Sequence, residues 1–163
     1  MEKMEITLNI NDKFHEVMVY PNETLLDVLR EKLDMTGVKE SCGEGVCGSC
    51  TVQMDGKPVR SCLTLAVEAQ GAKIKTVEGL ANGEELSDLQ QSFIDHGAVQ
   101  CGFCTPGMLM SADALLSENQ NPDEKAIRKA LAGNICRCTG YAKIVLAVAH
   151  AAEPNDHCSD CKS

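Results

Sequence analysis

The sequence has few aromatic residues, no stretch long enough to cross a membrane and no excess of positive charge. Phe, Tyr and Trp make up 3% of the 163 residues and Trp is absent, so we expect a core of small aliphatic side chains. No run approaches the roughly 20 apolar residues that a membrane-spanning helix needs. The formal net charge is −9, whereas nucleic-acid binding needs a basic face. The composition therefore predicts no nucleic-acid partner and no membrane span.

The amino terminus also lacks the pattern of an export signal. Its first 11 residues include Glu2, Lys3 and Glu5 and contain no continuous apolar segment. We therefore expect the chain to stay in the cytoplasm, a reducing compartment in which structural disulfides are rare. In that compartment the spacing of cysteines indicates metal ligation.

Cysteine, in contrast, is abundant. The chain has ten cysteines, roughly three times the number expected for its length from average composition. The positions of these ten residues are therefore the most informative feature of the sequence.

The first half of the chain mixes strand patterns with one helix pattern. Alternating apolar residues predict strands, and apolar residues at helical spacing predict a helix. In chain order these are strands at 4–10 and 15–20, a helix at 23–33 capped by Asn22 or Thr24, and strands at 51–54, 58–60 and 73–77. Turn signals at 11–13 and at Asp55-Gly56 predict two hairpins. Residues 1–77 are thus predicted to form a small α+β sheet domain.

Four cysteines of this half have the spacing of an iron–sulfur site. They are Cys42, Cys47, Cys50 and Cys62. The pattern Cys-x4-Cys-x2-Cys…Cys is that of plant-type [2Fe–2S] ligation. A four-cysteine zinc site and core-filling cysteines are the alternatives, but zinc ribbons favour two Cys-x-x-Cys pairs and this loop has one.

Glycines are interspersed with these cysteines. Gly43, Gly45 and Gly48 lie in the same loop. A backbone that wraps around inorganic sulfide and directs N–H groups at it needs positive φ angles, which glycine adopts freely. The glycines therefore favour the iron–sulfur interpretation.

The second half, residues 78–153, has helical patterns throughout. Helices are predicted at 86–96, 105–117 and 123–131, and a fourth is predicted to start at Thr139-Gly140. Gly97 and Gly133 are stop signals, Pro106 is a start signal, and Asn121-Pro122 is the predicted cap of the third helix. Short loops between short helices predict an antiparallel four-helix bundle.

Two cysteine pairs lie in the predicted loops of this bundle. Cys101 and Cys104 form one pair, and Cys136 and Cys138 form the other. Each pair is predicted to end one residue before a helix start, so a bound anionic cluster would face two positive helix N-termini. A redox dithiol at the first pair and a structural zinc site on all four are the alternatives.

Three segments together resemble one family. They are Cys-Gly-Glu-Gly-Val-Cys-Gly-Ser-Cys-Thr-Val at 42–52, Gln-Cys-Gly-Phe-Cys-Thr-Pro-Gly at 100–107 and Gly-Asn-Ile-Cys-Arg-Cys-Thr-Gly-Tyr at 133–141. The combination resembles the iron–sulfur part of the molybdenum hydroxylases, the xanthine dehydrogenase/aldehyde oxidoreductase family. The resemblance covers roughly residues 3–152 in order.

The resemblance implies an α+β architecture with two clusters. A β-grasp, plant-type ferredoxin-like domain at 1–77 would hold one [2Fe–2S] cluster, and an all-α four-helix bundle domain at 78–153 would hold the second. By resemblance the ligands of the first are Cys42, Cys47, Cys50 and Cys62, and those of the second are Cys101, Cys104, Cys136 and Cys138. In the family the second cluster lies beside a molybdopterin, which Gln100 and Cys138 would approach, and the first faces FAD.

The resemblance also implies a function. The chain has no Gly-rich dinucleotide loop and no room for a molybdenum domain, so it resembles the separate small subunit of a multi-subunit enzyme. It would pass electrons from the molybdopterin of a large partner subunit to the FAD of another, with no substrate site of its own. A free-standing two-cluster ferredoxin and a zinc-stabilised adaptor remain as alternatives.

Two features depart from the family pattern. Ser41 stands where family members commonly have Gly. The polar segment 154–163 is expected to be a disordered tail, and it carries Cys158 and Cys161 beside His157. These two cysteines are interpreted as unliganded thiols, with an adventitious or partner-shared metal as the alternative.

Overall fold

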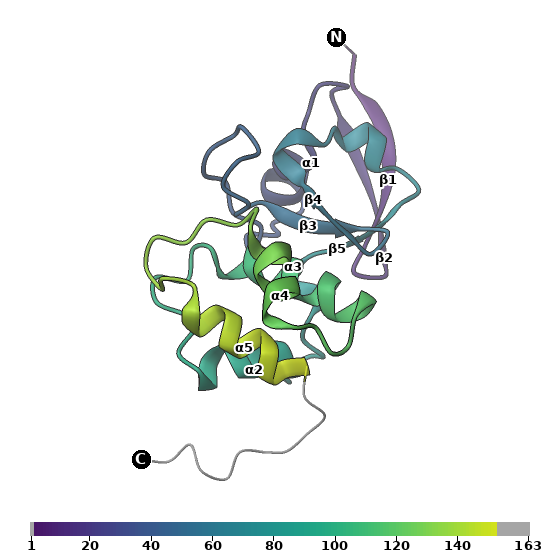
Figure 1. Cartoon of the computed structure of the whole chain (residues 1–163). Coiled ribbons are helices and arrows are strands. Elements are labelled where there is room, and N and C mark those ends of the chain that lie inside the picture. The colour runs from purple at the N-terminus through teal and green to yellow at the C-terminus, as the bar shows by residue number, and fades with distance from the viewer. Residues whose placement is uncertain (1, 153–163) are drawn as a thin grey trace.

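The computed structural model describes residues 2–152 and consists of a mixed β-sheet beside a group of helices (Figure 1). The predicted tail, with Cys158 and Cys161, lies outside the described residues. The strands are β1 (Met4–Ile10), β2 (Lys13–Val19), β3 (Thr51–Met54), β4 (Lys57–Arg60) and β5 (Lys73–Lys75). Their order is β2-β1-β5-β3-β4, and β1 and β5 are parallel while the other neighbours are antiparallel. This α+β layout confirms the predicted fold class.

Both predicted hairpins are present. Asn11 and Asp12 connect β1 to β2 with φ angles of 51° and 61°, and Asp55 and Gly56 connect β3 to β4 with 51° and 78°. Two successive positive φ angles define the type I′ turn, whose twist matches that of the strands it joins. The turns therefore fix the register of both strand pairs.

The helix after the first hairpin is shorter and less regular than predicted. It starts as α1 (Leu25–Asp27) and continues as a π-helical turn, η1 (Val28–Lys32). Thr24 caps it: the Thr24 hydroxyl accepts from Asp27 N, and the Asp27 carboxylate accepts from Thr24 N, both at 3.1 Å. Leu25 and Leu29 of this segment are fully buried in the same apolar core as the strand residues Leu8 and Val52.

Short 3-10 turns and four longer helices make up the rest of the chain. The 3-10 turns are η2 (Ser61–Leu63), η3 (Ala66–Ala69) and η4 (Val77–Gly79), and the helices are α2 (Asp88–Asp95), α3 (Thr105–Glu118), α4 (Glu124–Leu131) and α5 (Ala142–Ala152). Phe93, Met108, Ile127 and Ile144 lie at the centre of the helical core. No helix within residues 2–152 is both long and apolar enough to span a membrane.

The predicted cap of α4 and the predicted start of α5 were wrong. The cap of α4 is Asp123, whose carboxylate accepts from Ala126 N at 2.7 Å, and not Asn121-Pro122. Helix α5 starts at Ala142, and not at Thr139, because Gly140 and Tyr141 have φ angles of 65° and 68°. A right-handed helix cannot pass through two left-handed residues. Cys138 is therefore not directly at a helix N-terminus.

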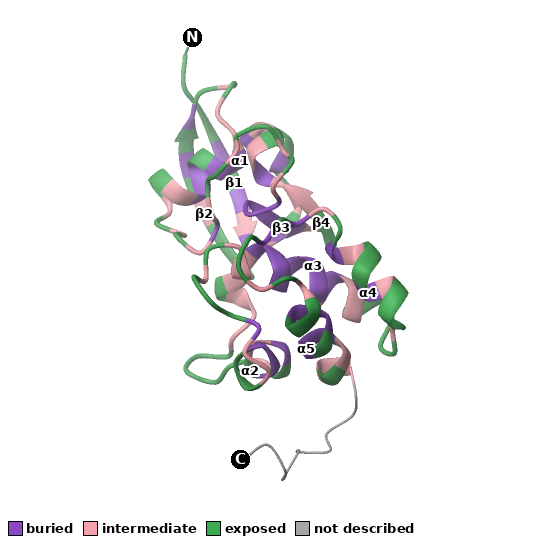
Figure 2. Ribbon diagram, turned by 60° about the vertical axis from the view of Figure 1, so that its left-hand side comes forward, coloured by how far each residue is buried: buried purple, intermediate pink, exposed green. Residues whose placement is uncertain are grey.

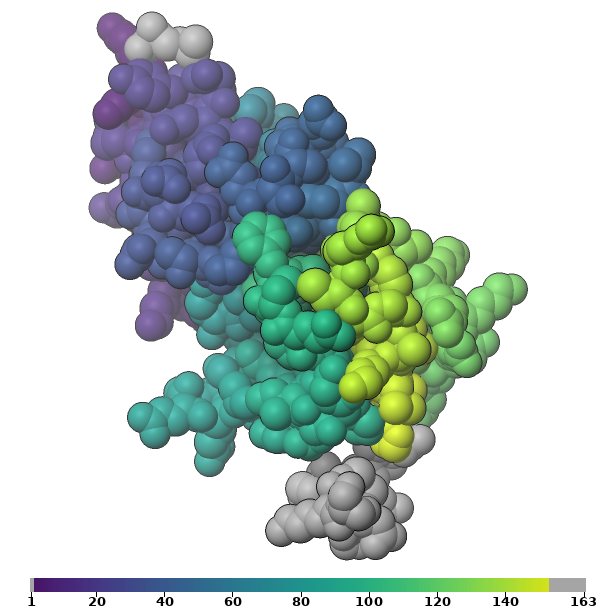
Figure 3. Space-filling model, turned by 90° about the vertical axis from the view of Figure 1, so that its left-hand side faces the viewer, coloured from purple at the N-terminus to yellow at the C-terminus, as the bar shows by residue number. Residues whose placement is uncertain are grey.

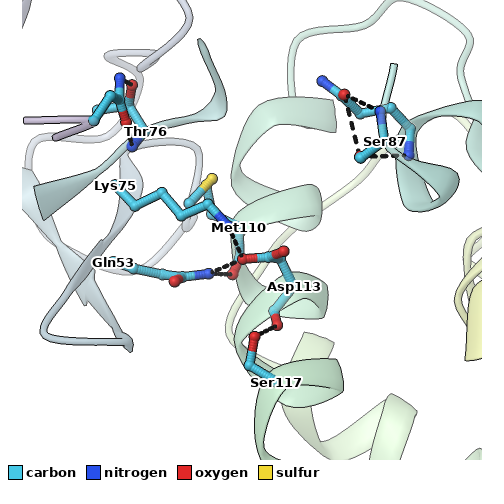
Figure 4. Close-up of polar contacts among 9 residues, drawn as sticks. Gln53, Lys75, Thr76, Ser87, Met110, Asp113 and Ser117 are labelled. Atoms are coloured by element: carbon cyan, nitrogen blue, oxygen red, sulfur yellow. Dashed lines mark hydrogen bonds and ion pairs between the residues drawn. The ribbon is translucent and has the colours of Figure 1, made fainter. Parts of the chain in front are cut away.

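Helix α3 joins the helical part to the sheet. It lies against β3, and most of its residues from Gly107 to Ala114 are buried (Figure 2). Figure 4 shows the Asp113 carboxylate of α3 between two side chains of the sheet. It accepts from Gln53 Nε2 at 2.7 Å and from Lys75 Nζ at 2.9 Å. These contacts hold the sheet against the middle of α3.

Candidate metal centres

The first cysteine group lies at one edge of the sheet domain. Cys42, Cys47 and Cys50 lie in the loop before β3, and Cys62 lies on η2, directly after β4. The Sγ atoms of Cys50 and Cys62 are 3.4 Å apart, and the thiols of Cys42 and Cys47 share a hydrogen bond. The structure thus brings all four predicted residues together as two pairs.

The glycines of this loop have the backbone conformation that the sequence predicts. Gly43, Gly45 and Gly48 have φ angles of 65°, 77° and 75°. Turning the chain in this way directs backbone N–H groups at sulfur, and Glu44 N lies 3.4 Å from Cys42 Sγ. Hydrogen bonds from the N–H groups of Cys47 and Glu44 lower the pKa of the Cys42 thiol to about 6. The loop therefore stabilises negative charge on sulfur.

The second cysteine group lies in two loops: Cys101 and Cys104 directly precede α3, and Cys136 and Cys138 lie between α4 and α5. The Sγ atoms of Cys101 and Cys138 are 3.6 Å apart, and the thiols of Cys104 and Cys136 share a hydrogen bond. Cys101 and Cys138 are exposed, whereas Cys136 is buried. These four predicted residues also come together as two pairs, one at the surface and one behind it.

Two residues that the sequence analysis did not assign to the site hold Cys136. Thr139 Oγ1 and Thr139 N donate to Cys136 Sγ at 3.1 and 3.4 Å, and Cys136 N donates to the Tyr141 hydroxyl at 2.8 Å. Burial opposes ionisation of Cys136, but the Thr139 hydrogen bonds outweigh it and lower its pKa. The sequence signal was present in the Cys-Thr-Gly-Tyr segment, but it was interpreted as a helix start.

Other thiols hold their protons strongly in the absence of metal. Burial raises the pKa of Cys62 to about 11, and burial together with the neighbouring Cys136 raises that of Cys104 to about 12. Contact with Cys101 raises the pKa of Cys138. Metal binding requires thiolates, so a cation bound by these groups would displace their protons.

The pairing of the thiols fits a two-metal centre better than a single ion. A tetrahedral zinc ion with Zn–S bonds of about 2.3 Å needs four sulfurs that are mutually about 3.8 Å apart. Within residues 2–152, no three His, Cys, Asp or Glu side chains are grouped so that they could hold one ion. A [2Fe–2S] cluster instead has four cysteine ligands shared by two irons, two for each iron. The residues present therefore fit such a cluster in both groups.

Both groups reach the surface among exposed apolar side chains. Val46 and Leu63, beside the first group, are 61% and 63% exposed, and Phe103 and Ile135, beside the second, are 44% and 53% exposed. Figure 3 shows the loop of the first group (blue) close to the two segments of the second (green and yellow-green) on one face of the molecule. Gln100 is also exposed, next to Cys101. Both groups are accessible to a partner.

A backbone hydrogen bond connects the two groups directly. Ile135 N donates to the carbonyl oxygen of Cys47 at 2.8 Å, and Ile135 precedes Cys136 in the chain. Arg60 lies at the same contact between the two groups, where its guanidinium donates to Gly133 O at 2.7 Å and to Thr51 Oγ1 at 2.8 Å. The two cysteine groups are therefore parts of one rigid arrangement.

The chain matches two family models of iron–sulfur domains. The 2Fe-2S iron-sulfur cluster binding domain matches residues 8–81, and a second [2Fe-2S] binding domain matches residues 76–149. Each matched segment contains one of the two cysteine groups. These matches support two [2Fe–2S] clusters, one for each group of cysteines.

Similar proteins are small subunits of larger oxidoreductases. The nicotinate dehydrogenase small FeS subunit of Eubacterium barkeri is 50% identical over 94% of this chain and 98% of its own length. The xanthine dehydrogenase iron–sulfur-binding subunit of Escherichia coli O157:H7 is 46% identical over 88% of this chain and 91% of its own. A chain of quinoline 2-oxidoreductase from Pseudomonas putida 86 is 51% identical, with a TM-score of 0.88 over 93% of this chain and 97% of that chain.

Proposed function

This chain belongs to the small [2Fe–2S] iron–sulfur subunits of the molybdenum hydroxylase family, and from that premise we propose that it conducts electrons from a molybdopterin centre to FAD. The observation that carries the proposal is the arrangement of two paired-thiol groups that are connected by the Cys47–Ile135 hydrogen bond. When bound, [2Fe–2S] clusters accept and donate single electrons. The chain's own residues hold these clusters and fix their positions.

Each cysteine group is proposed to hold one cluster. Cys42, Cys47, Cys50 and Cys62 are the proposed ligands of the first, in a ferredoxin-like domain at 1–77. Cys101, Cys104, Cys136 and Cys138 are the proposed ligands of the second, in the helical domain from residue 78. The N–H groups of Glu44 and Thr139, which already donate to cysteine sulfur, would stabilise the anionic clusters.

The partners are proposed to be two further subunits. A large subunit would hold molybdopterin beside Gln100 and Cys138, which are both exposed, and another would hold FAD beside the first cluster. Substrate would be oxidised on the large subunit and not on this chain. The complex is proposed to lie in the cytoplasm, where structural disulfides are rare and cysteines are available as metal ligands.

Purification of the complex tests this proposal against a free-standing ferredoxin. A tagged copy of this chain, isolated from its native cells, is expected to retain subunits that contain molybdenum and FAD. Metal analysis and flavin absorbance of the isolated material provide the measurement. Recovery of the chain as a monomer with its clusters, without molybdenum or flavin, would instead support a ferredoxin that serves several partners.

Gln100→Ala tests the proposed contact with molybdopterin. Because Gln100 is exposed and is not a thiol ligand, the variant is expected to keep its iron and its partners. Its expected defect is a weaker magnetic coupling between Mo(V) and the second cluster, measured by EPR of the partly reduced complex. Loss of iron in parallel with the coupling would make Gln100 a structural residue instead.

A further inference from the structure

One carboxamide is buried between the two cysteine groups. Asn134 is 2% exposed and lies two residues before Cys136. Its Nδ2 donates to the carbonyl oxygen of Gly48 at 2.9 Å and to Thr51 Oγ1 at 3.2 Å, and its Oδ1 accepts from Ser111 Oγ at 2.8 Å. Both ends of the carboxamide are therefore used, and each contacts a different part of the molecule.

These partners connect the segments that carry the cysteines. Gly48 lies between Cys47 and Cys50 in the first group, and Thr51 directly follows Cys50. Ser111 lies on α3, the helix that starts directly after Cys104. Asn134 thus fastens the loop of the first group to both segments of the second.

The backbones around Asn134 approach each other too closely for side chains. A Cβ atom on Gly48 would collide with the carbonyl oxygen of Gly133, and a Cβ atom on Gly107 would collide with the carbonyl oxygen of Gly48. These glycines therefore let the backbones of the two groups lie in direct contact. The carboxamide supplies directional hydrogen bonds at this close contact, where apolar packing alone would allow sliding.

We infer that Asn134 is a positioning residue that sets the separation and orientation of the two clusters and thereby the rate of electron transfer between them. The inference rests on the proposed function, because it requires both clusters to be bound. Only a carboxamide supplies the donors for Gly48 and Thr51 and the acceptor for Ser111 in one side chain. Removal of this group takes away the Nδ2 donor of the Gly48 carbonyl and leaves the Ile135–Cys47 and Arg60–Gly133 hydrogen bonds to join the two groups, so their relative position is less tightly fixed.

The chain contains a matched control for this role. Asp113 also connects the two halves, through Gln53 and Lys75, but these residues contact the middle of α3 and none is adjacent to a cysteine (Figure 4). A variant at Asp113 weakens the contact between the halves without touching the cluster loops. Comparison of Asn134 with Asp113 therefore separates control of cluster position from general stability.

The test is EPR spectroscopy of three forms of the full chain: wild type, Asn134→Ala and Asp113→Ala. Each form is loaded with iron and fully reduced with dithionite. Magnetic interaction between two reduced clusters depends steeply on their separation. Asn134→Ala is expected to keep the wild-type iron content and both cluster signals. The splitting of the EPR signals that arises from the interaction between the two clusters is expected to be smaller or broader. Electron transfer between the clusters after pulsed reduction is expected to be several-fold slower. Asp113→Ala is expected to lower the melting temperature and leave the splitting unchanged.

The outcomes separate this inference from the proposed function. An unchanged splitting in Asn134→Ala, or an equal change in both variants, overturns the role of Asn134 and leaves the proposed function intact. A wild-type chain without two [2Fe–2S] signals overturns the proposed function itself. If Asn134→Ala loses iron, the Ser111→Ala variant is measured instead. This variant removes only the hydrogen bond to Asn134 Oδ1, and an unchanged splitting of its EPR signals overturns the inference.

Discussion

Individual cysteines of the two groups differ in how readily they lose a proton. Cys42 accepts hydrogen bonds from the backbone N–H groups of Cys47, Glu44 and Val46, and these lower its pKa to about 6. Cys104 is more deeply buried and contacts Cys136, so its pKa rises to about 12. Cys42 is therefore a thiolate above about pH 6, whereas Cys104 stays protonated at every physiological pH.

This difference predicts the order of chemical modification in the folded chain without clusters. At pH 7.5 iodoacetamide is expected to alkylate Cys42 first, because the thiolate is the nucleophile, and Cys104 much more slowly. Peptide mapping by mass spectrometry after short reaction times provides the measurement. In urea both residues are expected to react at similar rates, and similar rates in the folded chain would contradict the assigned environments.

Single residues are also where the sequence was most informative. The eight cysteines predicted as ligands come together in their predicted groups, and they were found because such cysteine spacings are typical of cluster ligation. The positive φ angles at Gly43, Gly45 and Gly48 were predicted because the loop must turn its N–H groups towards sulfur. Thr139 was missed as a hydrogen-bond donor to Cys136, because a Thr-Gly pair after a cysteine is equally typical of a helix start.

At the scale of elements, the loop of the first group depends on glycines for two different reasons. Gly43 and Gly48 have nearly the same φ angle, 65° and 75°. Nothing lies within 4 Å of a Cβ atom built on Gly43, whereas one on Gly48 would collide with Gly133 and Asn134. Gly43 is therefore required only for backbone conformation, and Gly48 is required for both conformation and close contact.

This contrast predicts unequal effects of two alanine substitutions. Gly43→Ala is expected to lower the free energy of unfolding by about 1–2 kcal/mol, the cost of a left-handed conformation in a residue with a Cβ atom. Gly48→Ala is expected to cost clearly more, since the two cysteine groups must also separate. Thermal denaturation of the cluster-loaded variants measures both, and equal losses would show that Gly48 is not a contact point.

Helices and strands were predicted with uneven success. The two hairpins formed as predicted, because Asn-Asp and Asp-Gly specify their turns locally. The start of α5 was wrong by three residues: Tyr141 adopts a left-handed φ of 68° and uses its hydroxyl to accept from Cys136 N. The π-helical turn after α1 carries no recognised sequence signal, and the apolar spacing predicted an ordinary helix there.

At the scale of the whole molecule, the contacts between the halves were not predicted. The hydrogen bond from Asn134 to Gly48 joins residues 86 positions apart, and that from Gln53 to Asp113 spans 60. Such contacts have no local periodicity, so one sequence cannot reveal them. The domain limits at residue 77 stay a prediction, although the structure has two separate apolar cores and Val77 packs against the second.

The central claim is that this chain holds two [2Fe–2S] clusters in one rigid arrangement. Metal analysis combined with EPR of the reduced full chain tests it most directly. We predict about four irons per chain and two distinguishable [2Fe–2S] signals. A colourless chain with about two zinc ions and no signal after reduction would contradict the account and favour a zinc-stabilised adaptor.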